Sequence, residues 1–322
     1  MKSLKVVHCA NFSESKNGAV FYAIDRKISN GLIRNGHFVY DFSYREVAKS
    51  LAFFKSKKLG AKKMNLALMK VIENIKPDIL LLGHSEIVFN DTLDQVKRIY
   101  PNMKIAMWWV DPFENIDHIH DRIKYLDAFF ATTDPLYFDK LFKTKTSFFY
   151  IPNLCDNSIE VQKSFENKDH KYDLIFIGRD DENRREFIQK LNGLKNINYK
   201  HFGSSRDTLV LGNDFLELLF QSKMAVNYSR FNDISLYSSD RIVQLTGQGV
   251  LVFTPRIPNF EKLFTDEEVV YFDNFNDLEQ KVSYYLKHED ERVKVARAGH
   301  KKAHEIFNEK VVTLHMLEKI YN

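Results

Sequence analysis

The chain has 322 residues, of which 44% are hydrophobic, 14% aromatic and 28% charged, and its net charge is +4. This length suits two domains of ordinary size, and the composition excludes a disordered chain. The apolar runs are far shorter than the roughly 18 residues that span a bilayer, and the mild positive charge does not by itself indicate a nucleic-acid partner.

The N-terminus and the cysteines indicate the compartment. The first residues read as a strand, because their apolar stretch is too short for the core of a signal peptide. Cys9 and Cys155 lie far apart and lack metal-ligand spacing, which excludes a disulfide framework and a structural zinc site. We therefore expect a cytoplasmic protein with reduced thiols.

The first half of the chain alternates strand-like and helix-like segments. A strand is predicted over 5–9, a polar loop over 10–18, and a helix over 19–34 that Asn35-Gly36 ends. Further strands are predicted over 37–42, 78–83, 104–110, 128–132 and 147–151. This rhythm predicts a parallel sheet with helices on both faces.

The pattern lapses between 152 and 173 into Asn, Asp, Lys and Glu, and a second alternation follows. Its strands are predicted over 172–177, 197–202, 224–228, 250–253 and 269–272, and its last helices over 277–286, 291–307 and 310–321. We therefore expect an α/β chain of two tandem doubly wound, Rossmann-like domains with a cleft between their facing strand C-termini. The domains are placed over 1–155 and 156–305, and a C-terminal helix over 306–322 is expected to pack back on the first.

The segment 45–70 is basic and amphipathic. It carries Arg45 and seven lysines against one acid, Glu46, with leucine and phenylalanine between them. Such a stretch can rest on an anionic membrane surface or bind a polyanion, but an ordinary surface helix that packs its apolar side inward has the same pattern. Both interpretations stay open.

The segment 224–254 predicts a ligand site. An apolar run ends in polar residues, a loop leads to a short helix, and two glycines end that helix before the next strand. Open α/β sheets bind phosphorylated ligands where strand C-termini meet a helix N-terminus, and a guanidinium can bind two phosphate oxygens at once. The residues of this segment assigned to the site are Asn227, Ser239, Arg241, Gln244, Gly247 and Gly249.

The segments 221–230, 239–249, 284–286 and 292–300 resemble the GT-B glycosyltransferases, and among them the CgeB-like, group 1 type. The resemblance implies transfer of a sugar from a nucleotide-sugar to an acceptor, with the donor held mainly by the second domain. Neither a metal nor another cofactor is then expected, because arginines and helix N-termini meet the charge of the leaving group.

Within this resemblance, Arg241 corresponds to the basic residue near the donor diphosphate, and Arg179 is a further candidate for that role. The family usually places a Glu three residues after the Arg to bind the ribose hydroxyls. This chain has Gln244 there, which can accept a hydroxyl hydrogen bond but carries no charge.

A catalytic base is expected at a strand end of the first domain. Asp111 ranks first because it follows the apolar run 105–110, and His8 and His84 come next, ahead of Asp134. Asn17 and Gly18 could direct backbone N–H groups toward donor or acceptor, or could simply form a turn.

The predicted function is a bacterial glycosyltransferase whose acceptor is a surface polysaccharide, glycolipid or glycoprotein. In that case segment 45–70 could dock the enzyme at the inner face of the membrane or receive an anionic acceptor. A sugar-nucleotide epimerase of the same two-domain build is an alternative, although no carboxylate and His pair stands beside Arg241. A non-catalytic nucleotide or polyanion binder is a third reading, which Gln244 favours. A nucleic-acid partner is disfavoured because no aromatic and basic platform stands out.

Overall fold

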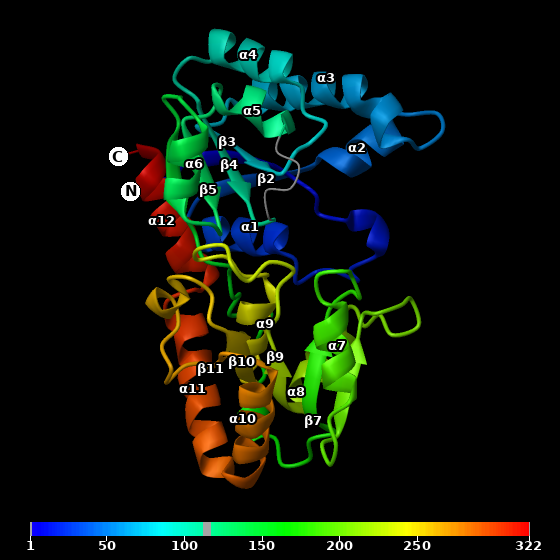
Figure 1. Ribbon diagram of the computed structural model, residues 1–322. Helices are drawn as coiled ribbons and strands as arrows, with labels where there is room; N and C mark the ends of the chain where they lie inside the picture. Colours follow the sequence, from blue (N-terminus) through cyan, green and yellow to red (C-terminus); the bar gives the residue numbers. More distant parts are fainter. Residues whose placement is uncertain (1, 112–116, 322) are drawn as a thin grey trace. The chain divides into compact units, whose positions relative to one another are not determined.

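The computed structural model of the protein describes residues 2–111 and 117–321 and divides the chain into two compact units (Figure 1). Unit 1 comprises Met1–Ile151 and Glu309–Asn322, and unit 2 comprises Pro152–Asn308. The boundaries predicted from the sequence lie at 155 and 305. Within the described ranges, no helix is long and apolar enough to cross a bilayer.

Unit 1 is built on a six-stranded sheet in the order β2-β1-β3-β4-β5-β6, and all its neighbouring strands are parallel. Its strands are β1 (Lys5–Ala10), β2 (Phe38–Ser43), β3 (Ile79–Gly83), β4 (Lys104–Trp109), β5 (Ala128–Ala131) and β6 (Ser147–Tyr150). Because helices cover both faces, the central strands have few exposed residues, and β3 is buried along its whole length.

The helices of unit 1 are α1 (Ile24–Arg34), α2 (Tyr44–Ser50), α3 (Lys57–Ile75), α4 (Asn90–Ile99), α5 (Asp117–Ile123), α6 (Pro135–Leu141) and α12 (Glu309–Tyr321). The core on one face of the sheet joins strand residues such as Leu80 and Met107 to Leu68 and Ile72 of α3. The helix predicted over 19–34 starts later, at Ile24, because a short 3-10 helix over Glu14–Lys16 and turns occupy the preceding residues.

Unit 2 is built on a five-stranded parallel sheet in the order β11-β10-β9-β7-β8. Its strands are β7 (Tyr172–Ile177), β8 (Tyr199–Phe202), β9 (Ser222–Val226), β10 (Leu251–Pro255) and β11 (Val270–Phe272), and its helices are α7 (Arg185–Asn192), α8 (Asn213–Phe220), α9 (Arg241–Gly247), α10 (Phe275–Lys287) and α11 (Glu289–Glu305). Two doubly wound α/β sheets therefore confirm the predicted fold class.

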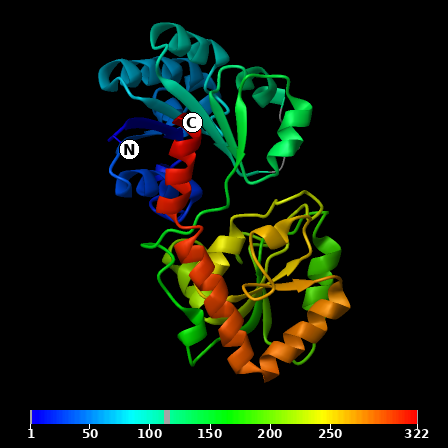
Figure 2. The same cartoon turned by 90° about the vertical axis from the view of Figure 1, so that its left-hand side faces the viewer.

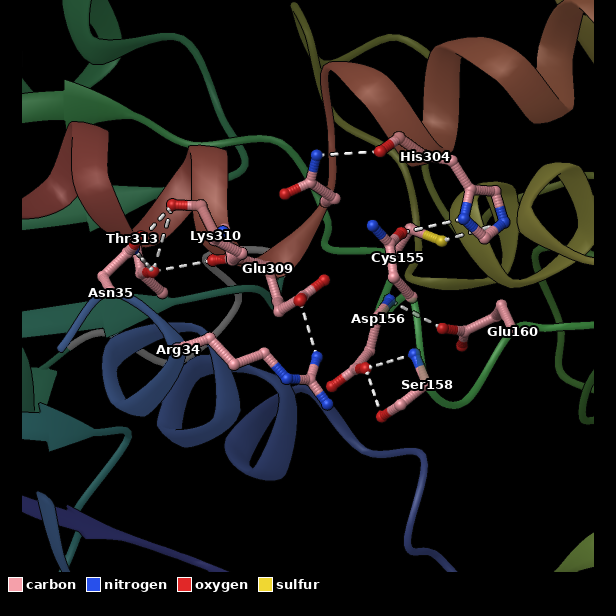
Figure 3. Close-up of polar contacts among 12 residues, drawn as sticks. Arg34, Asn35, Cys155, Asp156, Ser158, Glu160, His304, Glu309, Lys310 and Thr313 are labelled. Carbon is pink, nitrogen blue, oxygen red and sulfur yellow. Dashed lines mark hydrogen bonds and ion pairs between the residues drawn. The ribbon is translucent and has the colours of Figure 1, made fainter.

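The last helix of the chain, α12, belongs to unit 1 and lies along α1 (Figures 1 and 2). The helices approach so closely that a Cβ on Gly31 would lie 2.1 Å from the carbonyl oxygen of Glu309. Figure 3 shows the polar contacts of this pair: Arg34 forms an ion pair with the buried Glu309, and the Asn35 amide donates to Thr313 Oγ1 at 3.0 Å. A glycine and a buried ion pair thus fix α12 on α1.

Candidate functional site

Each sheet has one point where the chain reverses its direction of winding, and there the loops after two neighbouring strands diverge. In unit 1, β2 and β3 pair on opposite sides of β1, so this point lies between β1 and β3. In unit 2, β8 and β9 pair on opposite sides of β7, so it lies between β7 and β9. Open α/β sheets bind their ligands at such points, outside the carboxyl ends of the strands.

At the unit 2 switch point, two guanidinium groups lie over one aromatic ring. Arg241, the first residue of α9, has its Cζ 5.1 Å from the centroid of the Phe176 ring and donates from Nη1 to the Tyr228 carbonyl oxygen at 3.0 Å. Arg184 lies over the same ring at 6.0 Å and is 6% exposed. Burial, and then the charge of Arg184, lower the pKa of Arg241. An anion between these groups would relieve that repulsion.

Asp181 offsets part of this positive charge. Its Oδ2 accepts from Arg184 Nε at 2.9 Å and from Arg184 Nη2, and it lies 3.6 Å from Nε of Arg230. Gly178, directly after β7, leaves room for the Arg184 guanidinium, because a Cβ there would lie 2.8 Å from Nη1. One carboxylate among three guanidinium groups leaves a cationic site suited to a diphosphate.

Arg184 is the functional candidate that the sequence reasoning missed. It lies in the polar run 180–185, which reads as the exposed start of a helix, whereas Arg179 comes two residues after the predicted strand 172–177. In the structure Arg179 is exposed and Arg184 is buried beside Arg241. Asp181 and Arg184 are three residues apart just before a helix, a spacing that allows an ion pair. That spacing was the signal in the sequence that could have identified Arg184.

Asn227 and Ser239 lie at the same edge of the unit 2 sheet. The Asn227 side chain is buried and donates to Ser238 Oγ at 3.0 Å and to Thr254 Oγ1 at 3.1 Å, which ties the loop after β9 to β10. The Asn227 Oδ1 and Ser239 Oγ atoms are also buried, and neither has a hydrogen-bond partner among the described residues. Buried polar atoms are rarely left unsatisfied, so both are candidates to meet a ligand.

The remaining predicted donor residues are spread along α9. Gln244 lies one turn after Asp240 and donates to its Oδ2 at 2.7 Å. Gly247 ends the helix at its far end, where a Cβ would lie 2.9 Å from Cys155 Sγ. Gly249 has φ +73° and faces Phe165. The two glycines allow close packing away from the strand C-termini, so they are not proposed as donor contacts.

A hollow of about 430 Å³ lies at this edge of unit 2. Its lining includes Tyr228, Arg230, Phe231, Arg256 and Phe272. The Tyr228 ring is stacked on Phe187, with centroids 3.9 Å apart and planes at 8°. The hollow therefore offers aromatic surface and basic side chains beside the Arg184 and Arg241 pair, at a size typical of small-molecule sites.

In unit 1, His84 and Asp111 lie close together at the carboxyl edge of the sheet, after β3 and β4, next to the switch point. In the sequence, His84 directly follows β3, and Asp111 comes two residues after the neighbouring β4. In space, His84 Nδ1 lies 3.6 Å from Asp111 Oδ2. The half-buried imidazole is stacked on Trp109 with centroids 4.1 Å apart, whereas the Asp111 carboxylate is exposed. A carboxylate beside an imidazole orients the ring and stabilises its protonated form, as a general base requires.

The loop that carries His84 is strained and firmly held. His84 and Ser85 have φ values of +54° and +47°, a left-handed conformation that costs free energy for residues other than glycine. Arg122 of α5 is buried and donates to the carbonyl oxygens of His84, Ser85 and Val88 at 3.2, 2.9 and 2.6 Å. The surrounding structure therefore fixes the imidazole in place.

The other predicted residues of unit 1 have different surroundings. His8 is fully buried, Trp108 donates to its Nε2 at 3.0 Å, and its Nδ1 lies 2.8 Å from Ser29 Oγ. Burial, with a smaller contribution from the charge of Arg26, lowers the pKa of His8 to about 3. Because both of its ring nitrogens are engaged in the core, His8 is not proposed as the catalytic base. Asp134 caps α6 by accepting from the Leu136 amide at 3.1 Å.

Asn17 and Gly18 form a left-handed turn, with φ values of +51° and +83°. Asn17 is exposed, and Gly18 borders a hollow of about 250 Å³ that Phe12 and Arg26 also line. In residues 2–111 and 117–321, no group of three His, Cys, Asp or Glu side chains is arranged to hold a metal ion. Metal independence remains a prediction.

Residues 180–311 match the family described as glycosyl transferase-like. No curated protein sequence matches the chain significantly.

Among solved structures, the sucrose-phosphate synthase of Thermosynechococcus elongatus is 10% identical over 98% of both chains, with a TM-score of 0.63. AviGT4, a glycosyltransferase involved in avilamycin A biosynthesis, is 11% identical over 99% of this chain and 97% of its own, with a TM-score of 0.63. The β-glucosyltransferase of phage T4 is 14% identical over 99% of both chains, with a TM-score of 0.54. At these identities the likeness shows the fold, and the segment that matches the family contains Arg184 and Arg241. Residues 180–311 are thus glycosyl transferase-like in sequence, and the chain as a whole shares the fold of these solved enzymes.

Proposed function

We propose that the chain moves a sugar from a nucleotide-sugar to an acceptor hydroxyl, with the donor bound by unit 2 and the base supplied by unit 1. The observation that carries this proposal is the pair of guanidinium groups, Arg184 and Arg241, over Phe176 at a topological switch point. The donor diphosphate would bind these two groups with Arg230, and the nucleoside would enter the hollow beside Tyr228. Gln244 and Arg179 are proposed as weaker donor contacts.

In the proposed reaction, the acceptor oxygen attacks the anomeric carbon and the bond from that carbon to the diphosphate breaks. The nucleoside diphosphate leaves with the bonding electron pair, and the arginines stabilise the charge that develops on it. His84 takes the proton of the acceptor hydroxyl, and Asp111 stabilises the resulting imidazolium. Because guanidinium groups supply the positive charge, we propose that no metal is needed.

For the acceptor we propose a bacterial glycan, glycolipid or glycoprotein, and for the enzyme a cytoplasmic site of action. The acceptor would bind near His84 at the carboxyl edge of the unit 1 sheet, with the hollow beside Gly18 and Arg26 as a further contact. The CgeB-like subtype is part of the same proposal. It is supported by the order of motifs in segments 221–230 and 239–249.

The test is a panel of UDP-, GDP-, CMP- and dTDP-sugars, each measured for thermal stabilisation with magnesium and with a chelator. We expect one nucleotide to raise the Tm by about 5 °C at about a hundredfold excess over its Kd. That increase should be equal with and without metal. If no nucleotide-sugar changes the Tm, the donor site is wrong.

The active nucleotide-sugar then distinguishes the reaction classes. A transferase consumes it only with an acceptor, apart from slow hydrolysis, whereas an epimerase converts it alone. The variants His84→Ala and Asp111→Asn should keep the donor affinity of the wild type and lose turnover, by about a hundredfold or more for His84→Ala. Full turnover in His84→Ala would exclude it as the base.

A further inference from the structure

The loop after α2 and the outer face of α3 expose large apolar side chains. Phe53 is 94% exposed and Phe54 77%, and their rings meet edge to face with centroids 5.0 Å apart. On α3, Leu59 is 68% and Leu66 64% exposed. These four residues, together with Lys55, Lys58, Lys62 and Lys63, form the region that we call the α2–α3 surface. An apolar patch of this kind marks a contact surface.

The packing of α3 already uses other residues for the core of unit 1. Met64, Leu68 and Ile72 are fully buried, and Gly60 lies against the backbone of Ala48 in α2. A helix that needs only its inner face for folding would carry polar residues outside. Leu59 and Leu66, about two turns apart on one line of the helix, therefore have no role in the core.

Uncompensated positive charge surrounds these apolar residues. From 47 to 72 the sequence has seven lysines and neither Asp nor Glu. Lys57 and Arg45 are bound to Glu86, at 2.8 Å each. Lys55, Lys58, Lys62 and Lys63 are exposed and form no ion pair within the described residues. Lys62 and Lys63 lie between Leu59 and Leu66, so charge and apolar surface share one face.

We propose that the α2–α3 surface docks the protein on a bilayer that contains anionic lipids. The lysines would bind the headgroups, and Phe53, Phe54, Leu59 and Leu66 would enter the boundary between headgroups and acyl chains. Figure 1 shows the loop between α2 and α3 extending beyond the ends of these helices. A single-stranded nucleic acid fits less well, because aliphatic Leu59 and Leu66 offer neither stacking nor hydrogen bonds.

The docking surface is joined directly to the loop that carries His84. Tyr44 and Arg45 of α2 and Lys57 of α3 all bind the Glu86 carboxylate, two residues after His84. On the inner face of α3, Asn65 accepts from the Phe89 amide and donates to the Ile87 carbonyl oxygen, both at 2.9 Å. Docking would hold this edge of unit 1 near the lipid surface. A lipid-linked acceptor for His84 rests on the proposed function, whereas the docking itself does not.

The test is co-sedimentation of the full chain with vesicles of phosphatidylcholine alone and of phosphatidylcholine with phosphatidylglycerol. We expect binding only to the anionic vesicles, weakening as salt rises. Each of Lys58→Gln, Lys62→Gln and Lys63→Gln should reduce the partition coefficient by about fivefold. The double variant Phe53→Ser with Phe54→Ser should reduce it by about tenfold or more, because both rings then stay in water.

The matched controls are Lys143→Gln with Lys145→Gln, which remove exposed charge elsewhere on unit 1, and Leu209→Ser, which removes an exposed apolar side chain of unit 2. Both should bind vesicles almost as the wild type does. A Phe53→Trp variant should show blue-shifted emission on anionic vesicles, which reports insertion of this side chain.

Three results would overturn the proposal: equal binding to both kinds of vesicle, undiminished binding by the double phenylalanine variant, or no change in the emission of Phe53→Trp. Tight binding of a single-stranded oligonucleotide, without vesicle binding, would identify a nucleic acid as the occupant instead. Donor stabilisation in the nucleotide-sugar panel should be unchanged in all these variants. Failure of docking is thus distinguishable from failure of the proposed transfer reaction.

Discussion

Arg184 and its neighbour Arg185 show how burial separates two residues of the same type. The Arg184 side chain is 7% exposed, bound to Asp181 and held over Phe176 beside Arg241. The Arg185 side chain is 58% exposed and lies 3.9 Å from Asp180. An exposed ion pair contributes little free energy, whereas a guanidinium in a partly dry site binds phosphate strongly.

This difference predicts the effect of removing each charge. Arg184→Met should weaken nucleotide-sugar binding by about tenfold to a hundredfold, because a hydrogen bond to a charged group contributes about 1.5 to 3 kcal/mol. Arg185→Met should leave the affinity almost unchanged. Isothermal titration with the nucleotide from the panel measures both.

Because Arg184→Met also removes the partner of Asp181, Arg184→Lys serves as the second variant. It keeps a charge near Asp181 but loses the bidentate geometry, so it should remain folded and still bind the donor more weakly. If Arg184→Met and a folded Arg184→Lys variant both bind the donor as tightly as the wild type does, the diphosphate binds elsewhere.

At the scale of elements, the loop from His84 to Val88 depends on three helices. Arg122 of α5 binds its carbonyl oxygens, and α2 and α3 bind the side chain of Glu86. Burial opposes the charge of Glu86, but hydrogen bonds from Lys57 and Tyr44 and the charge of Arg45 outweigh it and lower the pKa of Glu86 to about 2. The ionised carboxylate therefore stabilises the folded unit.

The lowered pKa sets the direction of a pH effect. The contribution of Glu86 is complete above its ordinary pKa of 4.5 and is lost as the pH falls toward about 2. The difference in the free energy of unfolding between wild type and Glu86→Gln should be largest at pH 7 and shrink through that window, as urea unfolding at each pH would measure. Glu73→Gln, which removes an exposed ion pair with Lys70, should differ little at any pH. A difference for Glu86→Gln that does not depend on pH would contradict this account.

At the scale of the whole molecule, unit 1 is built from two segments of the chain that unit 2 separates in the sequence. The chain leaves unit 1 after Ile151, builds unit 2, and returns with α12, whose apolar side completes the core of unit 1. In α12, Met316 is 2% exposed and Leu314 40%. Two units with separate cores should respond separately to damage in one of them.

Met316→Asp should destabilise unit 1 by about 4 kcal/mol or more, since it buries a charge, and leave unit 2 intact. Leu314→Asp, on the same helix, should cost about 1 kcal/mol or less. Hydrogen exchange by mass spectrometry resolves the two units: peptides from β1, β3 and β4 should lose protection in Met316→Asp, while peptides from β7 and β9 keep it. Equal loss in both units would show that they unfold together.

Most of the architecture could be predicted from the sequence, because strands buried on both faces of a parallel sheet are continuous apolar runs. The bounds of the strands predicted over 78–83, 104–110, 172–177 and 250–253 agree within two residues with those of β3, β4, β7 and β10. The start of a helix was less accurate where turns precede it, as before Ile24, because a short polar run can form either a turn or the first turn of a helix.

The sequence by itself determined two α/β sheets and the edge at which polar residues gather, since both follow from local patterns of apolar and polar residues. Only the tertiary structure decided which of those residues are available to act. It buried His8 among Trp108 and Ser29, placed Arg184 beside Arg241, and brought Asp111 to His84. It also turned Leu59 and Leu66 away from the core. Burial, charge and hydrogen bonding depend on neighbours in space, and spacing along the chain does not specify those neighbours.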